Sequence, residues 1–319
     1  MRNTKRKCSL IAAAVFVLAS TGAGQEAKSF LSVQDILSGW QNNYGELKSM
    51  KVSYSEEIVS AEPSQRDPNI TNNLVKWTYL EKVEEGKKFR VKSSAARVKP
   101  SVSEQSFADI NSIEEMTFDG IHQRRYFPAQ KTGQIYAGLT YRDAGTDNRL
   151  KHYLLADPYT PLVEGEDSVF SKTIKKGLTD PNLTISVRPV LEQISGQMCH
   201  VVKIFRKDEI TAADFIWVAH ERGMLPMKFQ ESGLGRIVHE ITVEQVDFAK
   251  TENGGLWFPK KAFEVWNLPE SLGVIKYELN VLEFVPNIKV NPNTFQLDFP
   301  NGTQVGDTEL GLSYTVGVK

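Results

Sequence analysis

Most of the chain consists of short segments in which apolar residues recur at every second position, with turn residues between them. This period is that of a β-strand. Strands joined by tight turns pair with their neighbours in the chain, which favours an antiparallel meander. We therefore predict a mainly β (α+β) protein with about ten or eleven strands in one sheet, and a sheet of that length tends to curl or close.

The expected strands fall in two groups. In the first half they cover residues 50–59, a hairpin over 77–92 that turns near Glu85-Gly86, and residues 116–127 around an Asp119-Gly120 turn. In the second half they cover residues 183–194, 198–206 after a Ser195-Gly196 turn, 213–219, 224–231, 237–249, 256–266 and 274–284. The polar stretch 93–112 is expected to form a surface loop.

An amphipathic helix is expected before the first strand. Ser32 can cap it, and apolar residues follow at spacings of three and four: Val33, Ile36, Leu37, Trp40, Tyr44 and Leu47. Such a stripe must pack on an apolar surface. Two short helices or helical turns are predicted within residues 149–178, which Pro158 and Pro161 interrupt.

Residues 1–23 have the order of a secretory signal peptide. Basic residues come first, an apolar run covers residues 8–19, and small or polar residues follow, so we expect cleavage after Ala23 or Ala27. As a helix the apolar run rises only about 18 Å, which is short of a bilayer core of roughly 30 Å. We predict a single domain over residues 24–319 that is periplasmic or secreted, monomeric and not an integral membrane protein.

Charge and cysteine content limit the possible partners. Residues 1–23 hold four of the 38 Lys+Arg, so 34 would remain against 39 Asp+Glu. A mildly acidic chain gives no reason to expect nucleic acid as a partner. Only Cys199 would remain of two cysteines, and adjacent residues on a strand point to opposite faces. We therefore predict that Cys199 is a buried structural residue and does not pair with His200 as a nucleophile.

The sequence contains no recognisable catalytic or metal-binding motif. The five histidines, His122, His152, His200, His220 and His239, lack the spacing of metal ligands. A nucleophile elbow, a P-loop and a dinucleotide-binding glycine motif are missing as well. We predict a protein that is not an enzyme and has no metal or cofactor. A hydrolase with paired carboxylates stays open, because that geometry is spatial rather than sequential.

Two expected strands are apolar on both faces. They are residues 215–218, Phe-Ile-Trp-Val, and residues 256–258, Leu-Trp-Phe. A surface sheet normally alternates apolar with polar residues. Such strands imply cover on both sides of the sheet, or cover on one side and an apolar cavity on the other, and both alternatives remain open.

Residues 295–307, FQLDFPNGTQVGD, resemble the end of the periplasmic lipoprotein carriers, where an F-x-F-x-P strand precedes a G-x-x-V-x-D turn. Residues 215–218 followed by 223–228 resemble the apolar strand and Gly-Leu-Pro return strand of the same family. Residues 254–259, GGLWFP, resemble lipoprotein-sorting homologues of planctomycete-type bacteria. The order of elements resembles this family throughout, whereas specific residues match only from about Phe215 onward.

The resemblance implies an unclosed half-barrel whose concave side is apolar and covered by a helical lid. It implies a periplasmic carrier that binds acyl chains of lipids or lipoproteins without covalent chemistry, and burying one methylene contributes about 0.8 kcal/mol. An envelope protein-interaction or sensory module on the same scaffold is the alternative. Arg124 and Arg125 are candidates for the family's lid-locking arginine. Candidate cavity liners, each of which can equally be a core residue, are Trp77, Tyr79, Trp217, Met227, Phe229, Trp257, Phe263 and Tyr277.

Overall fold

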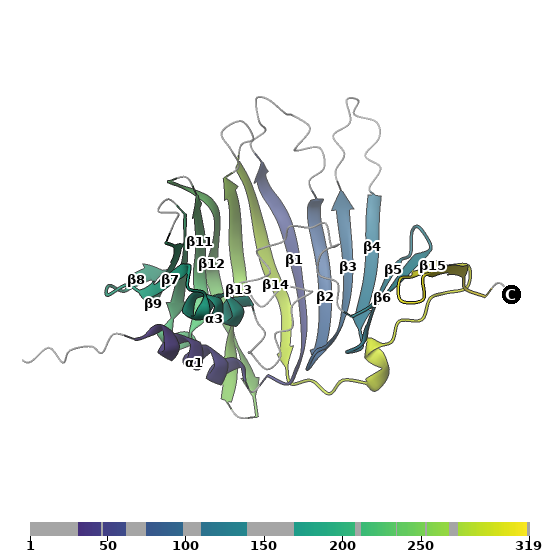
Figure 1. Cartoon of the computed structure of the whole chain (residues 1–319), viewed down its shortest axis with the longest axis horizontal. Coiled ribbons are helices and arrows are strands. Elements are labelled where there is room, and N and C mark those ends of the chain that lie inside the picture. Colours follow the sequence, from purple (N-terminus) through teal and green to yellow (C-terminus); the bar gives the residue numbers. More distant parts are fainter. Residues whose placement is uncertain are drawn as a thin grey trace, which may run out of the picture. The chain divides into compact units, whose positions relative to one another are not determined.

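The computed structural model describes residues 31–45, 47–61, 75–97, 110–138, 169–207, 212–233, 235–252, 254–267 and 274–317. Their strands form one 16-stranded sheet with the order β16-β15-β6-β5-β4-β3-β2-β1-β14-β13-β12-β11-β10-β9-β7, and β8 pairs with β9 beside this path. The two ends of the path do not pair, so the sheet is unclosed (Figure 1). This confirms the predicted fold class, a mainly β protein with an open sheet and a small helical part.

The first meander contains β1 (Ser49–Ala61), β2 (Val75–Glu85), β3 (Lys88–Arg97), β4 (Ile110–Phe118), β5 (His122–Phe127) and β6 (Thr132–Ala137). Its two predicted turns are present. Gly86 adopts a φ of 55° between β2 and β3, a conformation in which glycine has no steric cost. Between β4 and β5, Oδ1 of Asp119 accepts hydrogen bonds from the backbone amides of Ile121 and His122.

The second meander contains β7 (Leu183–Val187), β8 (Glu192–Ile194), β9 (Gln197–Arg206), β10 (Ala213–Ala219), β11 (Leu225–Gly233), β12 (Arg236–Thr251), β13 (Gly254–Asn267) and β14 (Val274–Pro286). The Ser195-Gly196 turn lies between β8 and β9, as predicted. Antiparallel pairing of β14 with β1 joins the two meanders. The short 3-10 helix η2 (His220–Arg222) connects β10 to β11.

Two α-helices pack on one end of this sheet. In α1 (Val33–Tyr44), the Ser32 and Asp35 side chains form a capping box, and Ile36, Leu37, Trp40 and Tyr44 are buried, as the sequence predicts. The second helix, α3 (Val169–Thr179), contacts both α1 and β7. In Figure 1 both helices lie over the part of the sheet that contains β7 to β13. We call the face that carries α3 the helix face.

The C-terminal segment continues the first meander. After the 3-10 helix η3 (Pro292–Phe295), the side chains of Phe295 and Leu297 are buried. Strand β15 (Gln304–Asp307) pairs in parallel with β6, and β16 (Leu312–Thr315) pairs antiparallel with β15. The sequence motif at residues 295–307 therefore packs this segment and adds strands to the sheet.

Three expectations differ from the structure or fall outside its described part. The sheet has more strands than the predicted ten or eleven, because β6, β15 and β16 are short and hold few apolar residues. The predicted surface loop at residues 93–112 overlaps β3, which continues to Arg97, and β4, which begins at Ile110. Residues 98–109, residues 149–168 of the helical insertion and the predicted signal peptide lie outside the described residues. Within the described part, no helix combines the length and apolar character that crossing a membrane requires.

A pair of glycines on the β6–β15 ladder tests the packing of the C-terminal segment. A Cβ at Gly133 would lie 2.7 Å from Cε1 of Phe299, whereas a Cβ at Gly306 would meet nothing within 4 Å. We expect Gly133→Ala to lower the free energy of unfolding by about 1–3 kcal/mol through overpacking. The matched Gly306→Ala should change it by less than about 0.5 kcal/mol. Urea unfolding measures both, and equal effects would show that Phe299 does not pack on Gly133.

Candidate binding site on the helix face

The pairing register shows which side chains share the helix face. Residues paired across antiparallel strands point to the same side of a sheet, so a chain of pairs defines a row. The first row contains Val187, Val202, Ile216, Phe229, Ile241, Glu264 and Tyr277. The second row contains Ile185, Ile204, Asp214, Glu231, His239, Trp266 and Ile275. A Cβ at Gly177 of α3 would lie 2.9 Å from Ile185 Cδ1, which places both rows on the helix face.

Both rows change from apolar to polar within the second meander, between β10 and β13. His239 Nε2 lies 2.7 Å from Oε1 of Glu264, and these two residues are 0% and 2% exposed. The His239 ring stacks on Trp266 at 3.8 Å between centroids, and its Nδ1 lies 4.0 Å from Oε2 of Glu231. A buried imidazole and two carboxylates therefore cross β11, β12 and β13 as one polar cluster.

Tyr277 extends this cluster to β14. It pairs with Glu264 in the register. Burial, together with the negative charges of Glu56 and Glu264, raises the pKa of Tyr277 to about 12. A phenol in such surroundings stays neutral at physiological pH.

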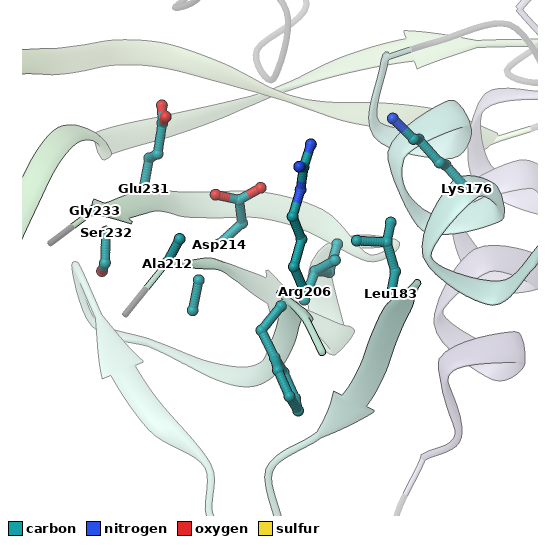
Figure 2. Close-up of a pocket in the computed structure, with 11 residues that line it drawn as sticks. Lys176, Leu183, Arg206, Ala212, Asp214, Glu231, Ser232 and Gly233 are labelled. Carbon is teal, nitrogen blue, oxygen red and sulfur yellow. The ribbon is translucent and has the colours of Figure 1, made fainter. Parts of the chain in front are cut away.

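The second row leads to a pocket of about 560 Å³ at one end of β7, β9, β10 and β11, which Asp214 and Glu231 help to line. Figure 2 shows the carboxylates of Asp214 and Glu231 on one side of this pocket and the Lys176 amine of α3 on the other, with the Arg206 side chain between them. The remaining lining residues are Leu183, Ile204, Phe205, Ala212, Ala213, Ser232 and Gly233. Its volume lies within the range of about 300–1,000 Å³ that is typical of small-molecule sites.

Buried charges also occur on the helix face of the first meander. Lys82 Nζ lies 2.6 Å from Oε2 of Glu84, and both side chains are fully buried. Arg125 is one of the two candidates for the lid-locking arginine. Its Nη2 lies 2.7 Å from Oε1 of Glu114, so Arg125 forms an ion pair within the sheet. The helix face is therefore not uniformly apolar, which differs from the concave surface that the resemblance implies. The alternation of apolar residues within single strands cannot predict a row of charged side chains, because such a row forms only when the strands are paired in register.

The structure brings three of the eight predicted liners together on the helix face. Phe229 and Tyr277 belong to the first row, and Met227 lies two positions from Phe229 on β11. Met227 and Phe229 are buried, whereas Tyr277 is half-buried. Their role as ligand contacts remains a prediction.

Three predicted liners occupy the opposite face. Trp217 pairs with Lys228, one position from Phe229, and its Nε1 donates a hydrogen bond to Oε2 of Glu192. Phe263 pairs with Thr242 and Glu278, and the ammonium groups of Lys261 and Lys276 lie over its ring. Tyr79 pairs with Ser55 and is 37% exposed.

The last two liners lie elsewhere. Trp257 lies near the beginning of β13, and its carbonyl accepts a hydrogen bond of 2.6 Å from the Tyr44 hydroxyl of α1. The Arg222 guanidinium lies 3.7 Å from the centroid of the Trp257 ring. Trp77 pairs through its backbone with Glu57 and Ala96, and its side chain lies outside the described part of the structure.

The position of Cys199 agrees with the sequence interpretation. Cys199 is fully buried, and burial raises the pKa of its thiol to about 12, so it is not activated as a nucleophile. His220 is exposed in η2. Among the described residues, no group of three His, Cys, Asp or Glu side chains is placed to hold a metal ion.

Sequence reasoning missed the four charged residues of the pocket. Lys176, Arg206, Asp214 and Glu231 come from α3, β9, β10 and β11, so no local spacing connects them. The one available signal was a carboxylate at a helix-face position in each of two apolar strands, Asp214 in β10 and Glu231 in β11.

No protein-family model matches the chain, and no curated protein sequence matches it either. Solved structures of similar architecture include a LolA superfamily protein from Nitrosomonas europaea, with 12% identity, a TM-score of 0.43, and coverage of 85% of this chain and 100% of that one. An outer membrane lipoprotein-sorting protein domain from Vibrio parahaemolyticus has 11% identity, a TM-score of 0.44, and coverage of 83% and 96%. The Pseudomonas aeruginosa MucA/MucB complex has 9% identity, a TM-score of 0.23, and coverage of 81% and 99%. The planctomycete part of the sequence resemblance stays a prediction.

The raised pKa of Tyr277 predicts a pH dependence of stability. The unfolded phenol ionises near pH 10, whereas the folded one ionises near pH 12. The contribution of Tyr277 is therefore complete below pH 10 and declines as the pH rises through this window. Between about pH 9 and about pH 11, wild type should lose about 1 kcal/mol more than Tyr277→Phe. Urea unfolding at the two pH values tests this, and parallel losses would contradict it.

Proposed function

We propose that this chain is an exported, non-catalytic binding protein of the periplasm that holds acyl chains of lipids or lipoproteins on its helix face. The observation that carries the proposal is the apolar character of the contact between α1 and the sheet. The buried stripe of α1 belongs to one apolar cluster with Ile216, Leu225, Met227 and Phe229. Hydrocarbon can replace such a stripe, because burial of apolar surface is non-directional.

A hydrogen bond at its last residue ties α1 to the sheet. The Tyr44 hydroxyl donates a hydrogen bond to the Trp257 carbonyl. The Asn43 side chain lies against Gly223, and its Nδ2 is buried without a hydrogen-bond partner in the described part of the chain. A buried unpaired donor costs about 1–3 kcal/mol, and displacement of α1 would relieve that cost. The surface that α1 covers, here called the seat of α1, is thus suited to bind a ligand in place of the helix.

A disulfide between α1 and the turn before β11 tests this proposal. A Cβ at Gly39 would lie 2.7 Å from Met224 Cγ, so cysteines at these positions have Cβ atoms at most about 4.2 Å apart, within reach of a disulfide. Oxidised Gly39→Cys/Met224→Cys protein, in a Cys199→Ala background, should take up a fluorescent fatty acid about tenfold more weakly than the same protein after reduction. Reduction serves as the internal control, because the sequence is unchanged.

Two results would contradict the acyl-chain proposal. One is equal uptake by the oxidised and reduced forms, which would show that the ligand does not bind to the surface that α1 covers. The other is a wild-type protein that takes up no fluorescent fatty acid and releases no lipid on organic extraction, as read by mass spectrometry. Extraction of a defined lipid from wild type and its absence from the oxidised variant would support it.

A protein-binding function is the second candidate, and the free edge of the sheet favours it. Among the described residues, strand β16 ends the path of strands and pairs only with β15. Leu310, Leu312 and Tyr314 expose 64%, 57% and 44% of their surface. Edge strands usually carry charge or proline against pairing, and residues 310–317 have neither. Such an edge fits an extended peptide segment of an envelope protein.

A single charge on this edge tests the second candidate. Leu312→Lys should prevent strand addition, because a lysine on an edge opposes pairing. An affinity pull-down from envelope extract should recover one defined partner with wild type and lose it with the variant. Thr308→Lys is the control, since it adds the same charge outside β16. Recovery of the partner by both variants would contradict strand addition at β16.

A further inference from the structure

The path of strands ends at β7 and at β16, and the two ends differ in the residues that oppose further pairing. Arg188 and Pro189 directly follow β7. A charge or a proline at an edge strand hinders the addition of another strand. Strand β16 lies beside β15, which Figure 1 shows near the C-terminus, and residues 310–317 contain neither charge nor proline. Among the described residues, the edge at β16 is therefore the one that is open to strand addition.

A hydrogen bond next to β16 shows which of its backbone groups point outward. The amide of Val316, directly after the strand, donates to the Thr303 carbonyl, directly before β15. Backbone groups of successive residues point to opposite sides of a strand, so the even-numbered residues of β16 face β15. Ser313 and Thr315 therefore direct their amide and carbonyl groups to the outer edge. A second strand added to β16 would bond to these two residues.

The side chains of this edge are apolar on one face of the sheet. Leu312 and Tyr314 belong to β16 and are both exposed, as is Leu310 in the turn before the strand. Residues two positions apart on a strand point to the same face, so Leu312 and Tyr314 lie side by side. The residues between and beside them are small or polar. Burial of Leu312 and Tyr314 against another apolar surface would stabilise a strand paired at this edge.

We infer that β16 pairs antiparallel with β16 of a second copy of this chain, around a two-fold axis at Ser313. Because Ser313 directs its backbone groups outward, it can exchange two hydrogen bonds with Ser313 of the second copy. This register places Leu312 of each copy opposite Tyr314 of the other, in the type of pair whose side chains lie closest together. An axis at Tyr314 would instead place Leu312 opposite Val316, which lies beyond the strand and is half-buried. The apolar residues of the edge thus complement themselves, and the same patch of both copies forms the interface.

The small size of this interface makes the dimer weak and reversible. Each copy contributes a strand of four residues, whereas a standard interface contains about 20–30 residues a side. The monomer that the sequence predicts is then the form at low concentration. The inference goes beyond the acyl-chain function and does not depend on it. A second copy and a peptide of an envelope protein would compete for β16, so experiment can distinguish the two occupants.

Sedimentation equilibrium over a range of protein concentrations tests the dimer. The average mass of wild type should rise with concentration from that of one copy toward that of two. Leu312→Lys and Tyr314→Glu should each weaken association about tenfold, because each places a charge opposite an apolar residue in two symmetric pairs. An equimolar mixture of the two variants should associate again. In the mixed dimer the lysine of one copy lies opposite the glutamate of the other, and the second pair is the original one of Leu312 with Tyr314.

Val190→Lys is the matched control for these variants. Val190 lies between β7 and β8 and exposes 68% of its surface, so this change replaces an equally exposed apolar residue by the same charge far from β16 along the sheet. The control should associate as wild type does. Urea unfolding should show that every variant is folded, because the substituted side chains are exposed.

Three results would overturn the inference. The first is a wild type that stays monomeric at every concentration; if Leu312→Lys also loses a partner from envelope extract, β16 binds that partner and not a second copy. The second is a mixture of Leu312→Lys and Tyr314→Glu that does not associate, which would reject the register around Ser313. The third is an equal loss of association in Val190→Lys, which would show that charge alone, and not pairing at β16, controls it.

Discussion

The antiparallel pairing of β1 with β14 holds the two meanders in one sheet. It aligns Met50 with Pro286 and Ala61 with Ile275, residues more than two hundred positions apart in the chain. Lys51 contributes on the face opposite the helices, where it contacts both Glu81 of β2 and Glu283 of β14. Every row of side chains that crosses from one meander to the other depends on this register. Because this pairing closes such a long loop, forming it costs more chain entropy in folding than forming the hairpins between neighbouring strands.

The helix face combines hydrocarbon and charge within single rows. The His239–Glu264 and Lys82–Glu84 pairs are buried among apolar side chains, and removing one partner of such a pair would leave an uncompensated charge in a poorly polar surrounding. Replacing a whole pair by apolar residues is often neutral or stabilising. Their presence is therefore weak evidence for stability.

Local signals in the sequence predicted the elements but not their assembly. The capping box at Ser32 and the Asp119-Gly120 turn depend on neighbouring residues, so their positions were readable. The parallel pairing of β15 with β6 joins segments far apart in the chain and leaves no local trace. Trp217 and Phe263 were predicted as liners for their aromatic side chains, and their strands contain the segments 215–218 and 256–258 that are apolar on both faces. Alternation then gives no marker of which face is which, and a register shift after Trp217 disturbs the period as well.

The seat of α1 and the charged pocket are physically linked through α3. Lys176 lies at the pocket, and the next residue, Gly177, packs against Ile185 of β7. The same helix contacts α1. Displacement of α1 would therefore remove packing from α3 as well. A ligand that replaced the α1 stripe would thus act on both helices and not on α1 alone.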